Sequence, residues 1–200
     1  MLDVVIATRN RHKFRELKAL LAVPGIRWRS LAAYPEVPAV RESGRSFEAN
    51  AVKKARAVAR ATGRPAVADD SGLEVKALRW GPGVRSARFA GSHGDDRANT
   101  RKLLRLLDGL PRRRRGARYR CALALASSAK LIAVAHGTWT GRIAQAPRGQ
   151  AGFGYDPVFF VPAFGKTVGE LAPAVKRRLS HRSRAARRLV PALRRLVRAA

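Results

Sequence analysis

Two segments far apart in the chain carry residue types that can bind a planar ring and its phosphates. Phe153-Gly154-Tyr155-Asp156-Pro157 places aromatic side chains beside a flexible glycine, and Lys176 and Ser180-His181-Arg182 follow with cations and an imidazole. An aromatic ring can stack on a base, and lysine and arginine can donate hydrogen bonds to phosphate or carbonyl oxygens. Either segment alone is a weak signal, but together they indicate a nucleotide-binding site.

A polar segment near the start, Thr8-Arg9-Asn10-Arg11-His12-Lys13, follows the apolar run Asp3 to Ala7 and precedes apolar residues at helical spacing. It lacks the glycines of a Walker loop. Backbone N–H groups at the helix start, the Thr8 hydroxyl, the Asn10 amide and the Lys13 ammonium can nevertheless all bind phosphate oxygens. By itself the segment is more typical of a capped helix that carries surface cations.

Asp69-Asp70 follows the apolar residues Ala66-Val67-Ala68, which predict a short strand whose end carries both carboxylates. Neighbouring carboxylates can bind Mg²⁺ and orient a water molecule. A pair of this kind also occurs in simple turns, so the surrounding segments must decide between the two interpretations.

Length and composition exclude several classes of protein. The chain has 200 residues, 46% of them hydrophobic, and a single cysteine, Cys121, so an intramolecular disulfide is excluded. Cys121 lies in an apolar run, where we expect a buried, unreactive thiol. No signal peptide is recognisable, and no run reaches the roughly 20 apolar residues of a membrane span. We expect a cytoplasmic protein with no membrane partner.

The charge is extreme, because 42 basic and 13 acidic residues give a formal net charge of +29. Nucleic acid is the first partner that such a charge suggests. The basic residues are scattered, however: only Arg112 to Arg115 is an uninterrupted run, and no nucleic-acid-binding motif accompanies it. We therefore favour a bias in amino-acid composition, rather than a nucleic-acid ligand, as the cause of this charge. The acid-free tail from Leu171 to Ala200, with ten basic residues, is either a nucleic-acid site or a solvated helix face.

The apolar patterns predict alternating helices and strands, followed by a hairpin. The expected elements are a strand at 3–7, a helix over Phe14 to Leu21, a helix from Ser46 to about Thr62, a strand at 66–68, a helix between Asp95 and Leu110, a hairpin of 119–126 and 131–139, a strand at 157–161, a segment at 168–179, and a final helix from about Ser183 that is bent or interrupted near Pro191. We therefore predict one α/β domain over residues 1–200, with a mixed, partly parallel twisted sheet flanked by helices.

Several segments together resemble the inosine/xanthosine triphosphate pyrophosphatase family, over nearly the whole chain. They are Thr8-x-Asn10-x-x-Lys13, Glu42 to Arg56, Asp69 to Val75 with Pro82 to Gly91, and the Phe153 and Ser-His-Arg segments described above. The resemblance implies a substrate cleft between two lobes and a homodimer. It also implies Mg²⁺-dependent hydrolysis of ITP, dITP and XTP to the nucleoside monophosphate and pyrophosphate.

The resemblance also assigns roles to single residues. It implies that Asp70 is the general base and a metal ligand, and that Lys13 and Lys54 neutralise phosphate charge as further catalytic residues. The substrate-binding residues in the matching segments are Thr8, Arg9, Asn10, Arg11, His12, Lys13, Ser71, Phe153, Gly154, Tyr155, Asp156, Lys176, His181 and Arg182. The last three can donate to the O6 of hypoxanthine or xanthine, where the amino group of adenine would meet them as a mismatched donor.

Two positions depart from the family pattern, since Arg41 and Ala49 stand where the family has acidic residues. Glu42 or Glu48, one residue away from these positions, could supply the missing charge. We assign Glu42 as the second ligand of Mg²⁺ beside Asp70.

Two other functions stay open. One is nucleic-acid binding on a pyrophosphatase-like scaffold, which would not need Asp70. The other is a related pyrophosphatase of the septum-associated type, which acts on other modified or pyrimidine nucleotides. Release of pyrophosphate from ITP, XTP, dITP, GTP and UTP, measured side by side, discriminates among the three.

Overall fold

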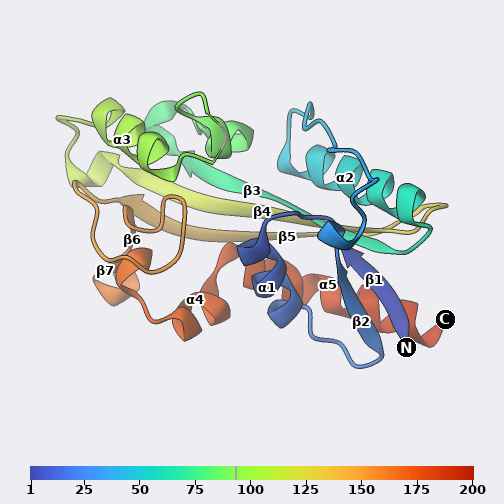
Figure 1. Cartoon of the computed structure of the whole chain (residues 1–200). Helices are drawn as coiled ribbons and strands as arrows, with labels where there is room; N and C mark the ends of the chain where they lie inside the picture. Colours follow the sequence, from blue (N-terminus) through green and yellow to red (C-terminus); the bar gives the residue numbers. More distant parts are fainter. Residues whose placement is uncertain (93) are drawn as a thin grey trace. The chain divides into compact units, whose positions relative to one another are not determined.

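The computed structural model describes residues 1–92 and 94–200 and shows strands and helices in alternation through the first half of the chain (Figure 1). The strands are β1 (Leu2–Ile6), β2 (Ile26–Ser30), β3 (Ala66–Val75), β4 (Gly116–Ala126), β5 (Leu131–Ile143), β6 (Phe159–Val161) and β7 (Lys166–Thr167). The helices are α1 (Arg11–Leu20), α2 (Phe47–Thr62), α3 (Asp96–Leu106), α4 (Pro173–Leu179) and α5 (His181–Arg198). In the described part of the chain, none of these helices combines the length and apolar character that crossing a bilayer requires.

The strands form a seven-stranded sheet in the order β2-β1-β3-β4-β5-β6-β7. β1 pairs in parallel with β2 and with β3, whereas β6 pairs antiparallel with β5 and with β7. Parallel neighbours need crossover connections, and α1 and α2 supply them. The predicted mixed, partly parallel sheet flanked by helices is confirmed.

The chain divides into two compact units, and the boundary falls inside β3. The first unit comprises Met1–Asp70, Cys121–Gly137 and His181–Ala200, and the second comprises Ser71–Arg120 and Thr138–Ser180. Whether the chain acts as one domain, as the sequence suggests, stays a prediction.

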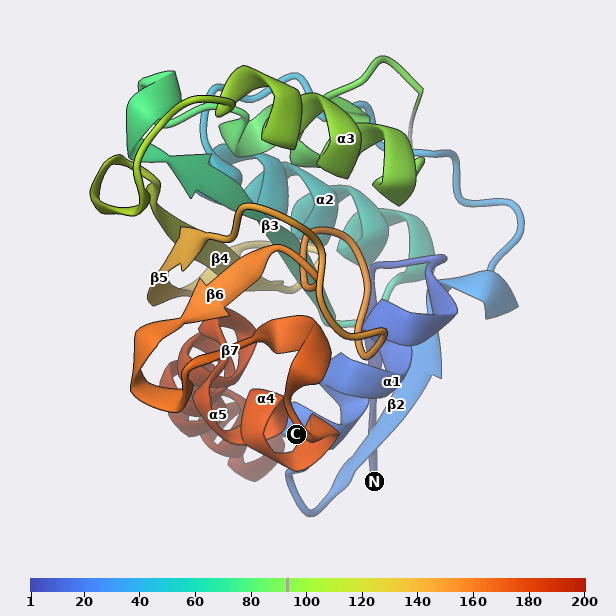
Figure 2. The same cartoon turned by 90° about the vertical axis from the view of Figure 1, so that its left-hand side faces the viewer.

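In the first unit, α1 and α5 cover one face of the strands and α2 covers the other (Figures 1 and 2). Val4 and Val67 of the strands and Leu17 of α1 pack with Leu189 and Leu193 of α5 in one buried cluster. The apolar residues of α5 recur every three or four positions, so its arginines from Arg184 onward are exposed on the outer face. Burial of this stripe holds α5 against the sheet.

The core of the second unit is aromatic. The Phe159 ring lies 4.4 Å from the Tyr119 ring and 5.9 Å from the Trp139 ring, measured between centroids. Leu103 of α3 and Leu107, just beyond its end, belong to the same buried cluster. This packing fixes the ends of β4, β5 and β6.

Several element boundaries differ from the sequence prediction. β3 continues to Val75 instead of ending before Asp69, because buried Leu73 and Val75 extend the strand. α5 runs without interruption through Pro191, which is exposed on the outer face, and begins at His181 rather than near Ser183. The strands β2 and β7 are not among the elements expected from the sequence. α3 ends at Leu106, before the left-handed glycine at position 109.

Candidate active site

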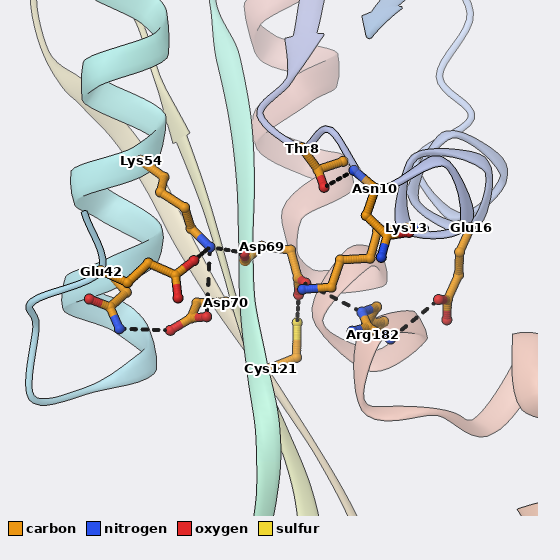
Figure 3. A network of polar contacts seen from close by, with 11 residues as sticks. Thr8, Asn10, Lys13, Glu16, Glu42, Lys54, Asp69, Asp70, Cys121 and Arg182 are labelled. Carbon is orange, nitrogen blue, oxygen red and sulfur yellow. Dashed lines mark hydrogen bonds and ion pairs between the residues drawn. The ribbon is translucent and has the colours of Figure 1, made fainter. Parts of the chain in front are cut away.

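Asp69 and Asp70 occupy consecutive positions of β3, and their side chains point to opposite sides of the strand (Figure 3). Successive residues of a strand alternate in this way. The carboxylate of Asp69 meets residues of α1 and α5, whereas that of Asp70 meets residues of α2. The sequence prediction that both carboxylates lie at a strand end is therefore wrong, and the two have separate surroundings.

Asp69 is buried among donors. Its Oδ2 lies 3.2 Å from Lys13 Nζ and 3.4 Å from Arg182 Nε, and its Oδ1 accepts a hydrogen bond from the Cys121 thiol at 3.1 Å. Burial alone would raise the pKa of Asp69, but attraction by Arg182 and by the two nearby lysines holds this pKa well below its usual range. Asp69 is therefore an anion at every pH at which the protein would work.

The Cys121 thiol is buried, as the apolar run predicts, and it has a polar partner in addition. Burial, with the Asp69 carboxylate beside it, raises the pKa of Cys121 well above that of a free thiol. Cys121 is thus a neutral hydrogen-bond donor rather than a nucleophile.

Asp70 faces Lys54. Lys54 Nζ lies 3.6 Å from Asp70 Oδ1 and 2.9 Å from Glu42 Oε1, and it donates to a backbone carbonyl of β3 at 2.6 Å. Asn50 Nδ2 donates to Asp70 Oδ2 at 3.0 Å, while its Oδ1 accepts from the Gly44 N–H at 2.7 Å. A Cβ at Gly44 would lie 2.6 Å from Asn50 Oδ1, so only glycine allows this approach. The loop that carries Glu42 is thereby fixed to α2.

The pKa of Asp70 moves in the opposite direction from that of Asp69. Burial is the largest cause and raises the pKa of Asp70 to about 6, with a contribution from the Glu42 carboxylate and partial opposition from Lys54. Asp70 and Glu42 in turn raise the pKa of Lys54 in spite of its burial, so this residue stays an ammonium. Asp70 is therefore ionised at neutral pH yet accepts a proton more readily than an ordinary aspartate.

The start of α1 has the cap that its sequence suggests. Asn10 Oδ1 accepts a hydrogen bond from the Lys13 N–H at 3.0 Å, and Thr8 Oγ1 accepts one from the Asn10 N–H at 3.2 Å. This geometry turns the Lys13 side chain toward Asp69 (Figure 3). The other predicted members of this segment are exposed, and they are Arg9, Arg11 and His12.

His181 and Arg182 are the first two residues of α5, and both are buried. Arg182 Nη1 lies 3.3 Å from Glu16 Oε2, and its Nε faces Asp69. Arg182 therefore bridges α1 and β3 with two carboxylate partners. Ser180, the residue before them, ends α4.

The aromatic segment belongs to the second unit. The buried Asp156 carboxylate accepts hydrogen bonds from the Phe153 N–H at 3.0 Å and the Tyr119 hydroxyl at 3.2 Å, and it pairs with the Lys176 ammonium. Lys176 Nζ lies 4.4 Å from the centroid of the half-buried Phe153 ring. Asp156 thus fixes both the ring and the cation that covers it.

The neighbours of Phe153 hold its loop in place. Gly154 has a φ of +66°, in the left-handed region, and its N–H donates to Asp96 Oδ2 at 2.7 Å. The Tyr155 hydroxyl donates to the Ser86 carbonyl at 2.9 Å, and burial raises the pKa of Tyr155. Ser71, which follows Asp70 on β3, is half-buried. The predicted site residues therefore form two groups, one in each unit.

Two carboxylates could hold a metal ion. In the described residues no three histidine, cysteine or acidic side chains gather as a complete protein site. Glu48 is exposed and pairs with His136 Nε2 at 3.2 Å, whereas Glu42 shares Lys54 with Asp70. Mg²⁺ commonly takes one or two carboxylates and completes its shell with water and substrate phosphates. Asp70 and Glu42 fit that requirement, and Glu48 does not.

Comparison with known proteins decides the family. The model of the Ham1 family matches residues 4–192 of the chain. The chain belongs to the Ham1 family. A dITP/XTP pyrophosphatase of Geobacillus kaustophilus is 51% identical over 189 residues, which cover 94% of this chain and 93% of that protein. A dITP/XTP pyrophosphatase of Mycolicibacterium paratuberculosis is 50% identical over 204 residues, which cover 100% of this chain and 99% of the other.

Solved structures agree with this Ham1-family assignment. The HAM1 protein of Coxiella burnetii has a TM-score of 0.89 at 39% identity, and the match covers 98% of this chain and 100% of that one. A nucleoside-triphosphatase, or dITP/XTP pyrophosphatase, of Mycobacterium abscessus has a TM-score of 0.78 at 46% identity, over 95% of this chain and 100% of the other.

The sequence patterns missed three members of the first group. Asn50 stands in a matching segment, but its bond to Asp70 is not apparent from the pattern. Glu16 lies three residues after Lys13 and so on the same helix face, which is a weak signal. Cys121 is 52 residues from its partner, and nothing in its apolar surroundings predicts the bond to Asp69.

Proposed function

We propose that this Ham1-family chain is a nucleoside triphosphate pyrophosphatase that converts ITP, dITP and XTP to the monophosphate and pyrophosphate. The names of its relatives support the substrate class. The observation that carries the chemistry is the contact of Asp70, whose pKa is raised to about 6, with the Lys54 ammonium. A carboxylate of this basicity can take a proton from water while the ammonium attracts the substrate. The relatives named above give no support to a nucleic-acid-binding function.

In the proposed reaction Asp70 orients a water molecule for attack on the α-phosphorus and accepts its proton. The new bond joins the water oxygen to the α-phosphorus, and the bond to the oxygen bridging the α- and β-phosphorus atoms breaks, with its electron pair leaving on pyrophosphate. Lys54 and Lys13 offset the negative charge of the phosphates. Mg²⁺, with Asp70 and Glu42 as its proposed ligands, would act as a Lewis acid toward the leaving group.

Recognition of the base is part of the same proposal. Phe153 offers a ring on which a purine can stack, a contact worth about 1 to 3 kcal/mol by analogy with stacking on nucleic-acid bases. Lys176, His181 and Arg182 are the proposed donors to O6. For Arg182 this role adds to its two carboxylate contacts, so its guanidinium is held in position before substrate binds.

The proposal on oligomeric state rests on the resemblance to the family. We propose a homodimer, which light scattering after size exclusion tests directly. Because the proposed substrates are free nucleotides and the single cysteine makes no disulfide, we place the reaction in the cytoplasm.

The proposed chemistry is tested by pyrophosphate release from ITP, dITP, XTP, GTP, ATP and UTP, with and without a chelator. Asp70→Asn removes the proposed base with little change of volume, and we expect kcat to fall more than tenfold. Asp108→Asn, at an exposed aspartate, is the matched control and should leave kcat unchanged. An Asp70→Asn enzyme with more than a tenth of the wild-type kcat refutes the assignment of the base, and a preference for UTP refutes the purine substrate.

A further inference from the structure

The second unit contains a cavity that none of the candidate site residues lines. Its volume is about 580 Å³, and its lining residues include Arg112, Arg142, Arg148, Gln145 and Phe160. Ile143, Ala144, Ala146 and Gly165 complete the lining. A cavity of this size lies in the range of sites for small organic ligands.

Strand register places a cation and a ring on one face of this cavity. Arg142 of β5 pairs directly with Phe160 of β6 in the antiparallel ladder. Side chains of such a pair lie on the same face of the sheet, with Cβ atoms about 5 Å apart. The Arg148 guanidinium lies 5.6 Å from the centroid of the Phe160 ring. The half-buried ring therefore has a guanidinium opposite it in the ladder and another over its surface.

Arg115 fixes the wall that carries Arg112. Its buried guanidinium donates to the carbonyls of Leu107, Leu110 and Ala144, at 2.7, 3.1 and 2.8 Å. Ala144 is itself part of the cavity lining. The run Arg112 to Arg115 is thus divided: Arg115 is a structural anchor, the exposed Arg112 lines the cavity, and the two exposed arginines between them do not line it.

Backbone hydrogen bonds hold the opposite wall. The Arg148 N–H donates to the Pro157 carbonyl at 2.8 Å, and the Arg148 carbonyl accepts from the Thr167 hydroxyl at 2.7 Å. The Ala144 N–H donates to the Val158 carbonyl at 2.8 Å. The walls are therefore set by the fold before any ligand arrives, which lowers the ordering cost of binding.

The charges of the cavity are only partly compensated. Its described lining residues include three arginines and no acidic side chain. Arg148 Nε lies 3.6 Å from Glu170 Oε2, but in the described part of the chain neither Arg112 nor Arg142 has a carboxylate within ion-pair distance. Guanidinium groups gathered in a concave site repel one another and attract anions, phosphate above all, because their donor fork fits two phosphate oxygens.

We propose that this cavity is a second ligand site that binds a free nucleotide, with its phosphate on Arg112 and Arg142 and its base against Phe160. An inorganic anion would use the arginines but not the ring of Phe160. A base also has polar edges, for which the Gln145 amide offers both a donor and an acceptor. A ring beside guanidinium groups, in a cavity of this volume, fits a mononucleotide better than a phosphate ion.

The test measures binding of AMP by isothermal titration calorimetry in the presence of a chelator. The probes are AMP, adenosine, inorganic pyrophosphate and a twelve-nucleotide oligo(dA). The cavity variant is Arg112→Ser with Arg142→Ser. The matched control is Arg113→Ser with Arg114→Ser, which removes the same charge from the same surface but outside the cavity. Thermal unfolding of both variants checks that they fold.

We expect the wild type and the control to bind AMP equally, and the cavity variant to bind it at least tenfold more weakly. Adenosine should bind at least tenfold more weakly than AMP. Phe160→Leu should weaken the binding of AMP but not the binding of pyrophosphate. The proposal would be overturned if both double variants bound AMP equally weakly, or if the protein bound oligo(dA) but not AMP. It would also be overturned if Phe160→Leu left the affinity for AMP unchanged.

The pyrophosphatase assay separates this proposal from the proposed function. Saturable AMP binding that depends on Arg112 and Arg142, in a protein that does not hydrolyse ITP, would leave the cavity proposal intact and refute the enzyme. Hydrolysis of ITP by a protein that does not bind AMP in this way would support the proposed enzyme and refute the cavity proposal.

Discussion

Replacing Asp70 by asparagine should have a more favourable effect on the stability of the metal-free protein at pH 8 than at pH 5. Folding raises the pKa of Asp70 from 3.8 to about 6, chiefly through burial. The folded state therefore holds this proton at pH values where the unfolded chain has released it, so stability falls as pH rises from about 4 to about 6. The whole pKa shift of Asp70 corresponds to about 3 kcal/mol in the free energy of unfolding, of which about 1.4 kcal/mol is lost between pH 5 and pH 8.

The assay is urea denaturation of the wild type and of Asp70→Asn at the two pH values, with a chelator present and tryptophan fluorescence as the signal. Asparagine does not titrate, so the free energy of unfolding of the variant relative to the wild type should rise by about 1.4 kcal/mol from pH 5 to pH 8. Asp108→Asn should show no such change, because Asp108 is exposed. A difference that is equal at both pH values, or larger at pH 5, would refute the argument that burial raises the pKa of Asp70.

Three further predictions concern other buried charges. Asp3 accepts hydrogen bonds from Arg27, which lower the pKa of Asp3 to about 2. Its contribution to stability is therefore present above pH 4 and is lost as pH falls toward 2. In urea titrations Asp3→Asn should be less stable than the wild type at pH 6, and this difference should shrink at pH 3. Arg115→Ala leaves three backbone carbonyls without their donor and should lower the free energy of unfolding by about 3 to 5 kcal/mol, whereas exposed Arg114→Ala should change it by less than about 0.5 kcal/mol. Arg182→Lys keeps a cation beside Asp69 but loses the donor fork, so the ratio of kcat/KM for ITP to that for ATP should fall several-fold, and an unchanged ratio would remove Arg182 from base recognition.

Sequence patterns predict an element well when its signals are local. The helix predicted from Ser46 to about Thr62 matches α2, because the Ser46 side chain caps it and Gly63, with a φ of +63°, ends it. β2 does carry a local strand signal, since arginines alternate with apolar Ile26 and Trp28, but this signal does not say which strand it pairs with. The partner of these arginines is Asp3 of the neighbouring strand, so the pairing of β2 is apparent only once the parallel register of β1 and β2 is known.

The candidate site shows the same limit. Asp70, Lys13 and Lys54 follow from the matching segments, and the structure gives each a carboxylate or ammonium partner. The extension of β3 through Asp69 and Asp70 does not follow, because two adjacent carboxylates normally interrupt a buried strand. Their cost is offset by cations on helices distant in the sequence, and neither spacing nor composition reveals these contacts.

Because the two aspartates are consecutive residues of one strand, insertions and deletions in β3 should be tolerated less well than substitutions. Removing or adding one residue between Ala66 and Asp69 would exchange the sides on which the two carboxylates emerge, because β3 alternates its side chains. A deletion that keeps the start of β3 in place would put Asp70 beside Arg182 and Ser71 beside Lys54, so Lys54 would lose the carboxylate whose pKa burial raises. Substitutions in this stretch can be absorbed by repacking, but a single-codon deletion there changes the residues that are presented on both sides of the strand at once. Loops far from β3 should therefore accumulate length changes, while this strand can change only in composition.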